Sequence, residues 1–92
     1  MTRPLDARHP RPDVQWFALE MERALRANDH KGGWWNSANG WLLRRLGQEV
    51  RELRRAMRQR SSEVGDAALI REAADVANLA MMIADNVRAG RE

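Results

Sequence analysis

One stretch of the chain is more apolar than a small protein can easily bury by itself. Between Ala73 and Ala84 only Asp75 and Asn78 are polar, and a helix that is apolar nearly all round must be covered on most of its sides. Three helices drawn from 92 residues cannot easily surround one of their own number. We therefore expect a helix over about 67–88 that is covered partly by a second subunit.

Two further helices are predicted upstream of this stretch. Apolar side chains repeat at three- and four-residue steps over about 13–27, and again from about 36 to 59. Such steps indicate one buried stripe along a helix. The glycine pair within 28–33 separates the two helices, and 60–66 is expected to form a short loop. Because no strand pattern competes, the sequence predicts an all-α fold.

The start of the second helix is expected at Asn36 or Ser37, since either side chain can cap a helix N-terminus. Residues 1–12 contain three prolines and are expected to form an irregular arm, which leaves 13–92 as the helical domain. No apolar run approaches the roughly 20 residues needed to span a bilayer. The arm also lacks the apolar segment of a secretory signal. We expect a soluble, cytoplasmic protein with no membrane partner.

The basic residues are almost all arginine. Fifteen of the sixteen are arginine, Lys31 is the only lysine, and the net charge is +3. Arginine suits phosphate binding, so nucleic acid is one conceivable partner. Thirteen acidic residues are interspersed among the arginines, however, and no long cationic block occurs. We therefore expect solvated helix faces, including the stripe on the second helix, and no nucleic-acid partner. That stripe consists of Arg44, Arg51, Arg55 and Arg58.

Two pairs of acidic residues occupy positions that suit metal binding. Glu49 and Glu52 are three residues apart on the second predicted helix, and Glu72 and Asp75 repeat this spacing on the third. Residues three apart leave a helix from the same face, so antiparallel packing would gather the four carboxylates. Clustered carboxylates repel one another unless a cation is present. Magnesium prefers such oxygen ligands and commonly also binds substrate phosphates, which points to phosphoryl chemistry.

A structural alternative exists for the first pair of acids. Arg45 lies four residues before Glu49, and Arg55 lies three after Glu52, so both acids could form ion pairs on a solvated face. Asp75 favours the metal interpretation, because near-apolar helical turns surround it and a buried carboxylate needs a partner.

At these positions the chain resembles a known family. Residues 48–52 (QEVRE), followed after nineteen residues by 72–75 (EAAD), resemble the E-E-x-x-E…E-x-x-D signature of the all-α nucleoside triphosphate pyrophosphohydrolases. That superfamily includes MazG, the dimeric dUTPases and the dCTP pyrophosphatases. Residues 30–34 (HKGGW) resemble a stretch of short MazG-like proteins, many of them phage-encoded, and 72–86 resemble their third-helix signature. The resemblance covers about residues 14–88.

The resemblance implies an activity and an assembly. The activity is magnesium-dependent hydrolysis of a nucleoside triphosphate, by attack of water on the α-phosphorus, to the monophosphate and pyrophosphate. Manganese is a possible substitute for magnesium. Purine deoxynucleotides are the favoured substrates, with a role in nucleotide-pool control, in the host cytoplasm if the protein is phage-encoded. The implied assembly is a homodimer or homotetramer in which three-helix subunits form a four-helix-bundle-type core.

The family's functional residues carry over by position. Glu49 and Lys31 match catalytic positions, Glu49 as the preferred acceptor of the water's proton and Lys31 as a contact to phosphate oxygens. Four positions match metal ligands: Glu49, Glu52, Glu72 and Asp75. Four match substrate-binding positions: Lys31, Trp34, Asn78 and Asn86. Gln48 replaces the first acid of the signature, so water activation or metal number can differ from the family's.

Several of these assignments have rival interpretations. Trp34 suits a loop anchor as well as a contact to the base, and both asparagines suit buried polar contacts across a subunit interface. His30 is expected to be structural or a weak phosphate contact. For the whole chain, the alternative to an enzyme is a non-catalytic helical module of the same fold that binds a nucleotide or a partner.

Overall fold

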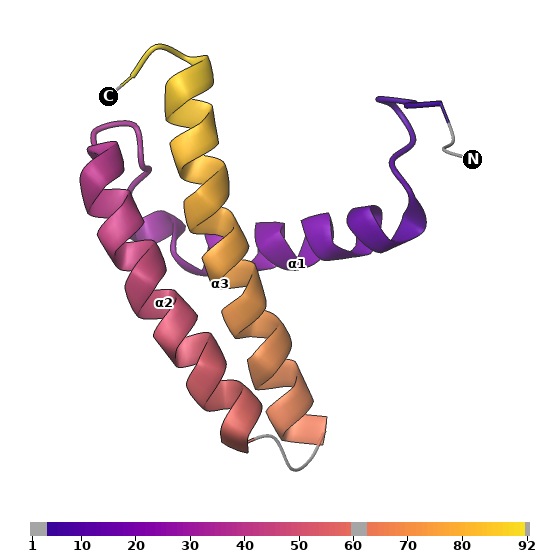
Figure 1. Cartoon of the computed structure of the whole chain (residues 1–92). Helices are drawn as coiled ribbons and strands as arrows, with labels where there is room; N and C mark the ends of the chain where they lie inside the picture. Colours follow the sequence, from indigo (N-terminus) through magenta and orange to yellow (C-terminus); the bar gives the residue numbers. More distant parts are fainter. Residues whose placement is uncertain (1–3, 60–62, 92) are drawn as a thin grey trace.

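The chain folds into three α-helices and one short 3₁₀ helix. The structure is a computed structural model, and it describes residues 4–59 and 63–91. The elements are α1 (Pro12–Ala27), η1 (Asp29–Lys31), α2 (Asn39–Gln59) and α3 (Glu63–Arg88) (Figure 1). Within these described ranges no strand occurs, so the predicted all-α class is confirmed.

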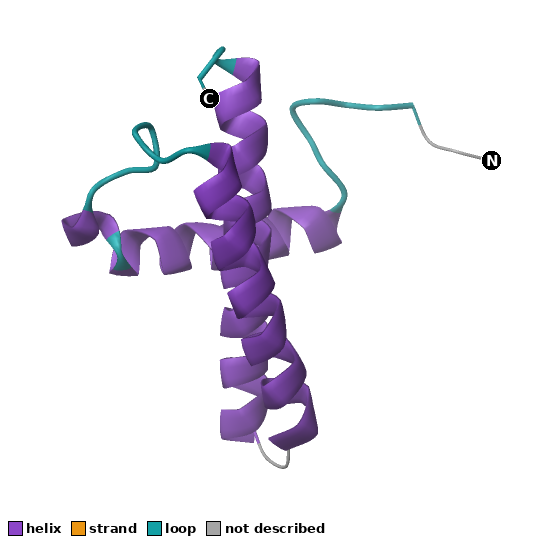
Figure 2. Cartoon of the chain, turned by 60° about the vertical axis from the view of Figure 1, so that its left-hand side comes forward, coloured by secondary structure: helices purple, strands orange, loops and turns teal. Residues whose placement is uncertain are grey.

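Helix α3 is the central element of the fold. It runs antiparallel to α2, and α1 lies across it, so that both other helices pack on α3. Figure 2 shows α1 crossing the α2–α3 pair at a steep angle. The most apolar segment of the sequence therefore contacts both other helices. None of the described helices is both long and apolar enough to span a membrane.

The side chains that are fully covered are few and small. The apolar ones are Ala24 of α1, Leu42 of α2 and Ala74 of α3. Asn78 and Asn86 of α3 are the buried polar side chains within the described chain. Such a thin core leaves much of each helix surface uncovered.

Two helices begin at positions that differ from the expected ones. Helix α2 starts at Asn39, so neither Asn36 nor Ser37 begins it. The Ser37 N–H donates to the Trp34 carbonyl at 2.9 Å, and the Ser37 carbonyl accepts from Asn86 Nδ2 at 3.3 Å. Ser37 is therefore held in a turn. Its carbonyl accepts a hydrogen bond from α3 instead of from a first turn of α2.

The other difference lies in the α2–α3 connection. The loop was expected over 60–66, but α3 already begins at Glu63, and 60–62 lie outside the described residues. The glycine at position 65 does not interrupt the helix.

Asn86 links the C-terminal end of α3 to the segment before α2. Its Nδ2 donates to the Ser37 carbonyl at 3.3 Å and to Asn39 Oδ1 at 3.0 Å. Its Oδ1 accepts from Arg91 Nε at 2.9 Å. Because the side chain is fully buried, each of these hydrogen bonds is made away from competing water.

Replacing Asn86 should test this link. In Asn86→Leu the size of the side chain is nearly kept, but the hydrogen bonds are lost and their partners remain partly buried. We expect the free energy of unfolding to fall by about 1–3 kcal/mol, measured by urea denaturation. Glu22→Ala, at an exposed position on α1, should stay within about 0.5 kcal/mol. Equal effects of the two substitutions would show that Asn86 does not stabilise the link between α3 and the segment before α2.

Candidate metal centre

The packing of α2 on α3 gathers three carboxylates from different parts of the chain. Glu49 of α2 and Glu72 and Asp75 of α3 each offer one oxygen, and these three oxygens lie within 4.8 Å of one another. Glu72 and Asp75 leave α3 from one face because they are three residues apart. All three residues are half-buried. The spacing argument is thus confirmed for three of the four acids.

The cluster carries more negative charge than its surroundings neutralise. The pKa of Glu72 is raised from its ordinary 4.5 to about 7, chiefly by burial, then by a hydrogen bond shared with Glu49 and by the nearby charges of Glu49, Asp75 and Glu52. Burial and the charge of Glu49 likewise raise the pKa of Asp75, although Arg71 and Arg45 oppose the shift. Glu72 Oε2 is buried without a hydrogen-bond partner. Such a cluster attracts either a proton or a cation.

Glu52 does not join the three clustered acids. Arg55 Nη1 lies 3.4 Å from its Oε2, and the Glu52 side chain is 46% exposed. Arg45 Nη2 likewise contacts Glu49 Oε1 at 3.1 Å. Both ion pairs of the structural alternative therefore form. The Arg45–Glu49 pair leaves Glu49 in the cluster, whereas the Arg55–Glu52 pair holds Glu52 outside it.

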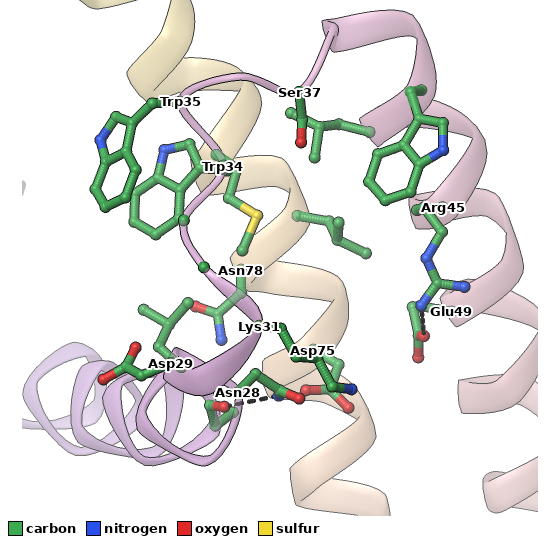
Figure 3. Close-up of a pocket in the computed structure, with 18 residues that line it drawn as sticks. Asn28, Asp29, Lys31, Trp34, Trp35, Ser37, Arg45, Glu49, Asp75 and Asn78 are labelled. Carbon is green, nitrogen blue, oxygen red and sulfur yellow. Dashed lines mark hydrogen bonds and ion pairs between the residues drawn. The ribbon is translucent and has the colours of Figure 1, made fainter.

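A cavity of about 730 Å³ adjoins the acids (Figure 3). Glu49 and Asp75 lie on its wall, so one edge of the cluster faces the open space. The volume falls within the ~300–1,000 Å³ usual for small-molecule sites. Other wall residues include Lys31, Trp34, Trp35, Trp41, Arg45 and Asn78.

The two glycines before Trp34 shape the cavity wall for different reasons. Gly32 has φ +88°, a left-handed conformation that favours glycine. At Gly33 an added Cβ would lie 1.6 Å from the Trp35 ring, so this position has no room for a side chain. The Trp34 and Trp35 rings stack with centroids 5.1 Å apart. The glycine pair thus allows the chain to turn immediately before the two stacked tryptophans.

Trp34 is also anchored to the end of α3. Its Nε1 donates to Asp85 Oδ2 at 3.0 Å. The same carboxylate accepts from Arg88 at 2.6 Å and from Arg91 at 2.5 Å. Hydrogen bonds from Arg88 and Trp34 lower the pKa of Asp85. Trp34 therefore fills the predicted role of a loop anchor, and it also lines the cavity.

Lys31 and Asn78 both lie on the cavity wall. Lys31 ends η1 and is exposed. Asn78 Nδ2 donates to the Met21 carbonyl at 3.0 Å, and because a carbonyl only accepts, this bond fixes the orientation of the amide. Asn78 Oδ1 is then left buried without a partner. Besides Arg45, the cavity wall thus includes the Lys31 cation and one unsatisfied acceptor.

Asn86 lies apart from the cavity. Its amide is used by the hydrogen bonds to Ser37, Asn39 and Arg91. This placement matches the predicted alternative of a buried polar contact, although the contact is made within the chain rather than across a subunit interface. His30 is exposed in η1 and is absent from the cavity wall.

Three residues of this region were not predicted as part of the site. Arg45 was expected only as an ion-pair partner of Glu49, yet it lines the cavity together with Trp35 and Trp41. Both tryptophans are about half exposed, which is unusual for so large an apolar side chain. Clustering of three tryptophans within eight residues was the signal in the sequence that could have placed them there.

Comparison of the chain with protein-family models, curated proteins and solved structures found no match. The functional interpretation therefore rests on the residues and their geometry.

The raised pKa of Glu72 makes the stability of the metal-free protein depend on pH. An acid whose folded pKa is raised favours the folded state while protonated, so its contribution is complete below about pH 4.5 and disappears as the pH rises through about 7. We expect the melting temperature in EDTA to be higher near pH 5 than near pH 8. The lowered pKa of Asp85 acts only at more acidic pH. Thermal melts followed by circular dichroism would measure the difference.

Two comparisons sharpen this prediction. Glu72→Gln should flatten the dependence between those pH values, because the amide does not titrate. A divalent cation that binds the cluster should stabilise the unsubstituted protein more near pH 8 than near pH 5, since protons compete for the same oxygens. An identical pH dependence in Glu72→Gln would show that Glu72 is not its source.

Proposed function

We propose that the chain is a MazG-like, magnesium-dependent nucleoside triphosphate pyrophosphohydrolase. It would convert a (d)NTP and water to the (d)NMP and pyrophosphate. The observation that carries the proposal is the position of the Glu49, Glu72 and Asp75 cluster at the edge of a cavity that also presents Lys31 and a wall of tryptophans. The resemblance of residues 30–34, 48–52 and 72–86 to that family supports the same activity.

The donor set suits magnesium. All three clustered ligands are carboxylates, and hard divalent cations prefer oxygen. Glu72 Oε2 is buried and unpartnered, as expected of an atom that awaits a cation. Glu52 would become the fourth ligand by leaving Arg55. When bound, magnesium supplies charge neutralisation and orientation for the triphosphate. Manganese also prefers oxygen ligands.

The chain's own residues would accept the proton of the water and stabilise charge on the phosphate. Glu49, on the cavity wall and steadied by Arg45, would accept the proton of the attacking water. Lys31 would donate to phosphate oxygens on which charge develops. Water attacks the α-phosphorus, the bond to the bridging oxygen breaks, and pyrophosphate leaves with the electron pair of that bond.

The other end of the cavity suits a nucleoside. Trp34, Trp35 and Trp41 offer broad apolar faces, against which a purine would bury more area than a pyrimidine. Asn78 Oδ1 is an unsatisfied acceptor, so it suits a hydroxyl or amino group of the ligand. These features support a purine base for the proposed substrate. The preference for a deoxynucleotide, with a role in nucleotide-pool control, is what the family resemblance implies.

One observation favours the non-catalytic alternative. Arg45 and Arg55 already pair with Glu49 and Glu52, as they would on a helix whose acids are structural. A helical module of this kind would use the cavity to bind a nucleotide or a partner without turning it over.

Pyrophosphate release from a panel of canonical dNTPs and NTPs, with magnesium, tests the two possibilities. We expect release that requires magnesium and is highest for dATP or dGTP. Glu72→Ala should lower it by roughly 100-fold or more, since loss of a metal ligand should cost at least the ~10–100-fold typical of an outer-shell partner. Glu22→Ala, an exposed acid on α1, is the matched control. Nucleotide binding without release would favour the module.

We also propose that the chain assembles into a homodimer or homotetramer with a four-helix-bundle-type core. The accessible surface is 7442 Å², whereas a compact monomer of 10.6 kDa should expose about 5,500 Å². The radius of gyration is 14.8 Å against about 12.3 Å for a compact chain of this length. The extended arm adds to both values, but large apolar side chains are exposed on all three helices. They include Val14, Trp16, Leu19, Leu43, Met57 and Val87.

Sedimentation equilibrium at micromolar concentration would measure the assembly. We expect a mass of two or four chains, because exposed apolar helix faces favour association in water. A folded species with the mass of one chain, 10.6 kDa, would refute the proposed oligomer.

A further inference from the structure

Helix α2 carries a ridge of arginines on its outer side. Arg51, Arg54, Arg55 and Arg58, here called the arginine ridge, are all exposed and together line a shallow concavity of about 220 Å³. Their steps of three and four residues place them on one face. The buried Leu42 lies nine residues before Arg51, a rotation of roughly 180° on a helix. The ridge therefore faces away from the packed side of α2.

The arginines of the ridge are poorly neutralised by the protein. Arg55 contacts Glu52 at 3.4 Å, but Arg51, Arg54 and Arg58 have no acidic partner among the residues that the structure describes. Like charges three and four residues apart destabilise a helix. An external polyanion would relieve that repulsion.

The structure also removes the sequence argument against a nucleic-acid partner. That argument relied on acids interspersed among the arginines. In the fold, Glu49 turns toward α3 and joins Glu72 and Asp75, while Glu52 lies at the edge of the ridge and pairs with one arginine only. Of the two acids that alternate with the arginines, Glu49 is thus directed away from the ridge, and only Glu52 remains beside it.

We propose that the arginine ridge binds the phosphate backbone of nucleic acid. The four side chains extend over about 10 Å of helix, and Arg44, two turns earlier on the same face, extends the row to about 21 Å. Such a row fits successive phosphates along a strand rather than one compact anion. Between Arg44 and Arg51, Gly47 leaves open space above the helix, so a strand can approach the backbone there.

The chemistry of the ridge indicates binding that is independent of nucleotide sequence. Guanidinium groups make paired hydrogen bonds to phosphate oxygens, and phosphate contacts carry no sequence information. Among the described residues, arginine alone lines the concavity, so it offers no amide to read adenine and no carboxylate to read cytosine. The ridge lies on the side of α2 away from the carboxylate cluster, so the proposal does not depend on the proposed enzymatic activity.

Fluorescence anisotropy with labelled duplex and single-stranded DNA, over a range of salt concentrations, tests the ridge. The full chain should bind, with an affinity that falls steeply as salt rises. Arg51→Gln/Arg54→Gln/Arg58→Gln should weaken binding at low salt by roughly tenfold or more and reduce the salt slope by about 2–3, since each phosphate contact contributes about 0.9. Whichever form of DNA binds more tightly identifies the preferred strand geometry.

A matched control separates the ridge from net charge. Arg8→Gln/Arg11→Gln/Arg26→Gln removes the same charge from exposed positions outside α2, and it should bind DNA within about twofold of the unsubstituted chain. Equal weakening in both triple variants would overturn the proposal, because it would show a general charge attraction. Absence of salt-dependent binding by the unsubstituted chain would also overturn it.

Two further measurements distinguish other roles of the same arginines. Sedimentation should give the same mass for the ridge variant and the unsubstituted chain. A lower mass, together with unchanged DNA binding, would assign the arginines to contacts between copies of the chain and overturn the proposal. Pyrophosphate release should be the same in the ridge variant and the unsubstituted chain. The release assay therefore tests the proposed enzymatic activity independently of DNA binding.

Discussion

The antiparallel packing of α2 on α3 is the interaction on which the candidate site depends. It brings Glu49 beside Glu72 and Asp75, and it also half-buries these three carboxylates. Burial disfavours the ionised forms, so close packing of the helices favours a proton or a cation among the three carboxylates. The unpartnered Glu72 Oε2 and the raised pKa of the same residue are two consequences of this single constraint. Closing the helix pair and binding a positive charge are therefore coupled.

The cavity beside the cluster depends on contacts at the other end of α3. Asp85 holds the Trp34 indole, and Asn86 holds the carbonyl of Ser37. Together they tie the segment between η1 and α2 to the helix that carries Glu72 and Asp75. The glycines at 32 and 33 then allow the stacked tryptophans to lie against the cavity. One helix thus positions both the acidic edge and the aromatic wall of the candidate site.

Sequence patterns predicted the features that depend on local periodicity. The apolar stripes gave the three helices, and the three-residue spacing of acids predicted that Glu72 and Asp75 share a face. Helix α2 begins two residues after Ser37, whose carbonyl accepts from Asn86, 49 residues further along the chain, a contact that local periodicity does not reveal. Glu52 stayed outside the cluster because a neighbour on the same helix, Arg55, competes for it. Periodicity indicates which residues share a face, but it does not decide between two partners that are both within reach.

The same reasoning explains how α2 presents two surfaces of opposite charge. A helix rotates by about 100° per residue, so acids and arginines that alternate in sequence can lie on different sides of the helix. Packing selects which side of α2 faces α3, and the buried Leu42 and the clustered Glu49 identify that side. Arg51 and Arg54 are then directed outward, where water lowers the cost of their mutual repulsion but does not remove it. The burial of one stripe of α2 therefore determines which side of the helix attracts a cation and which side attracts an anion.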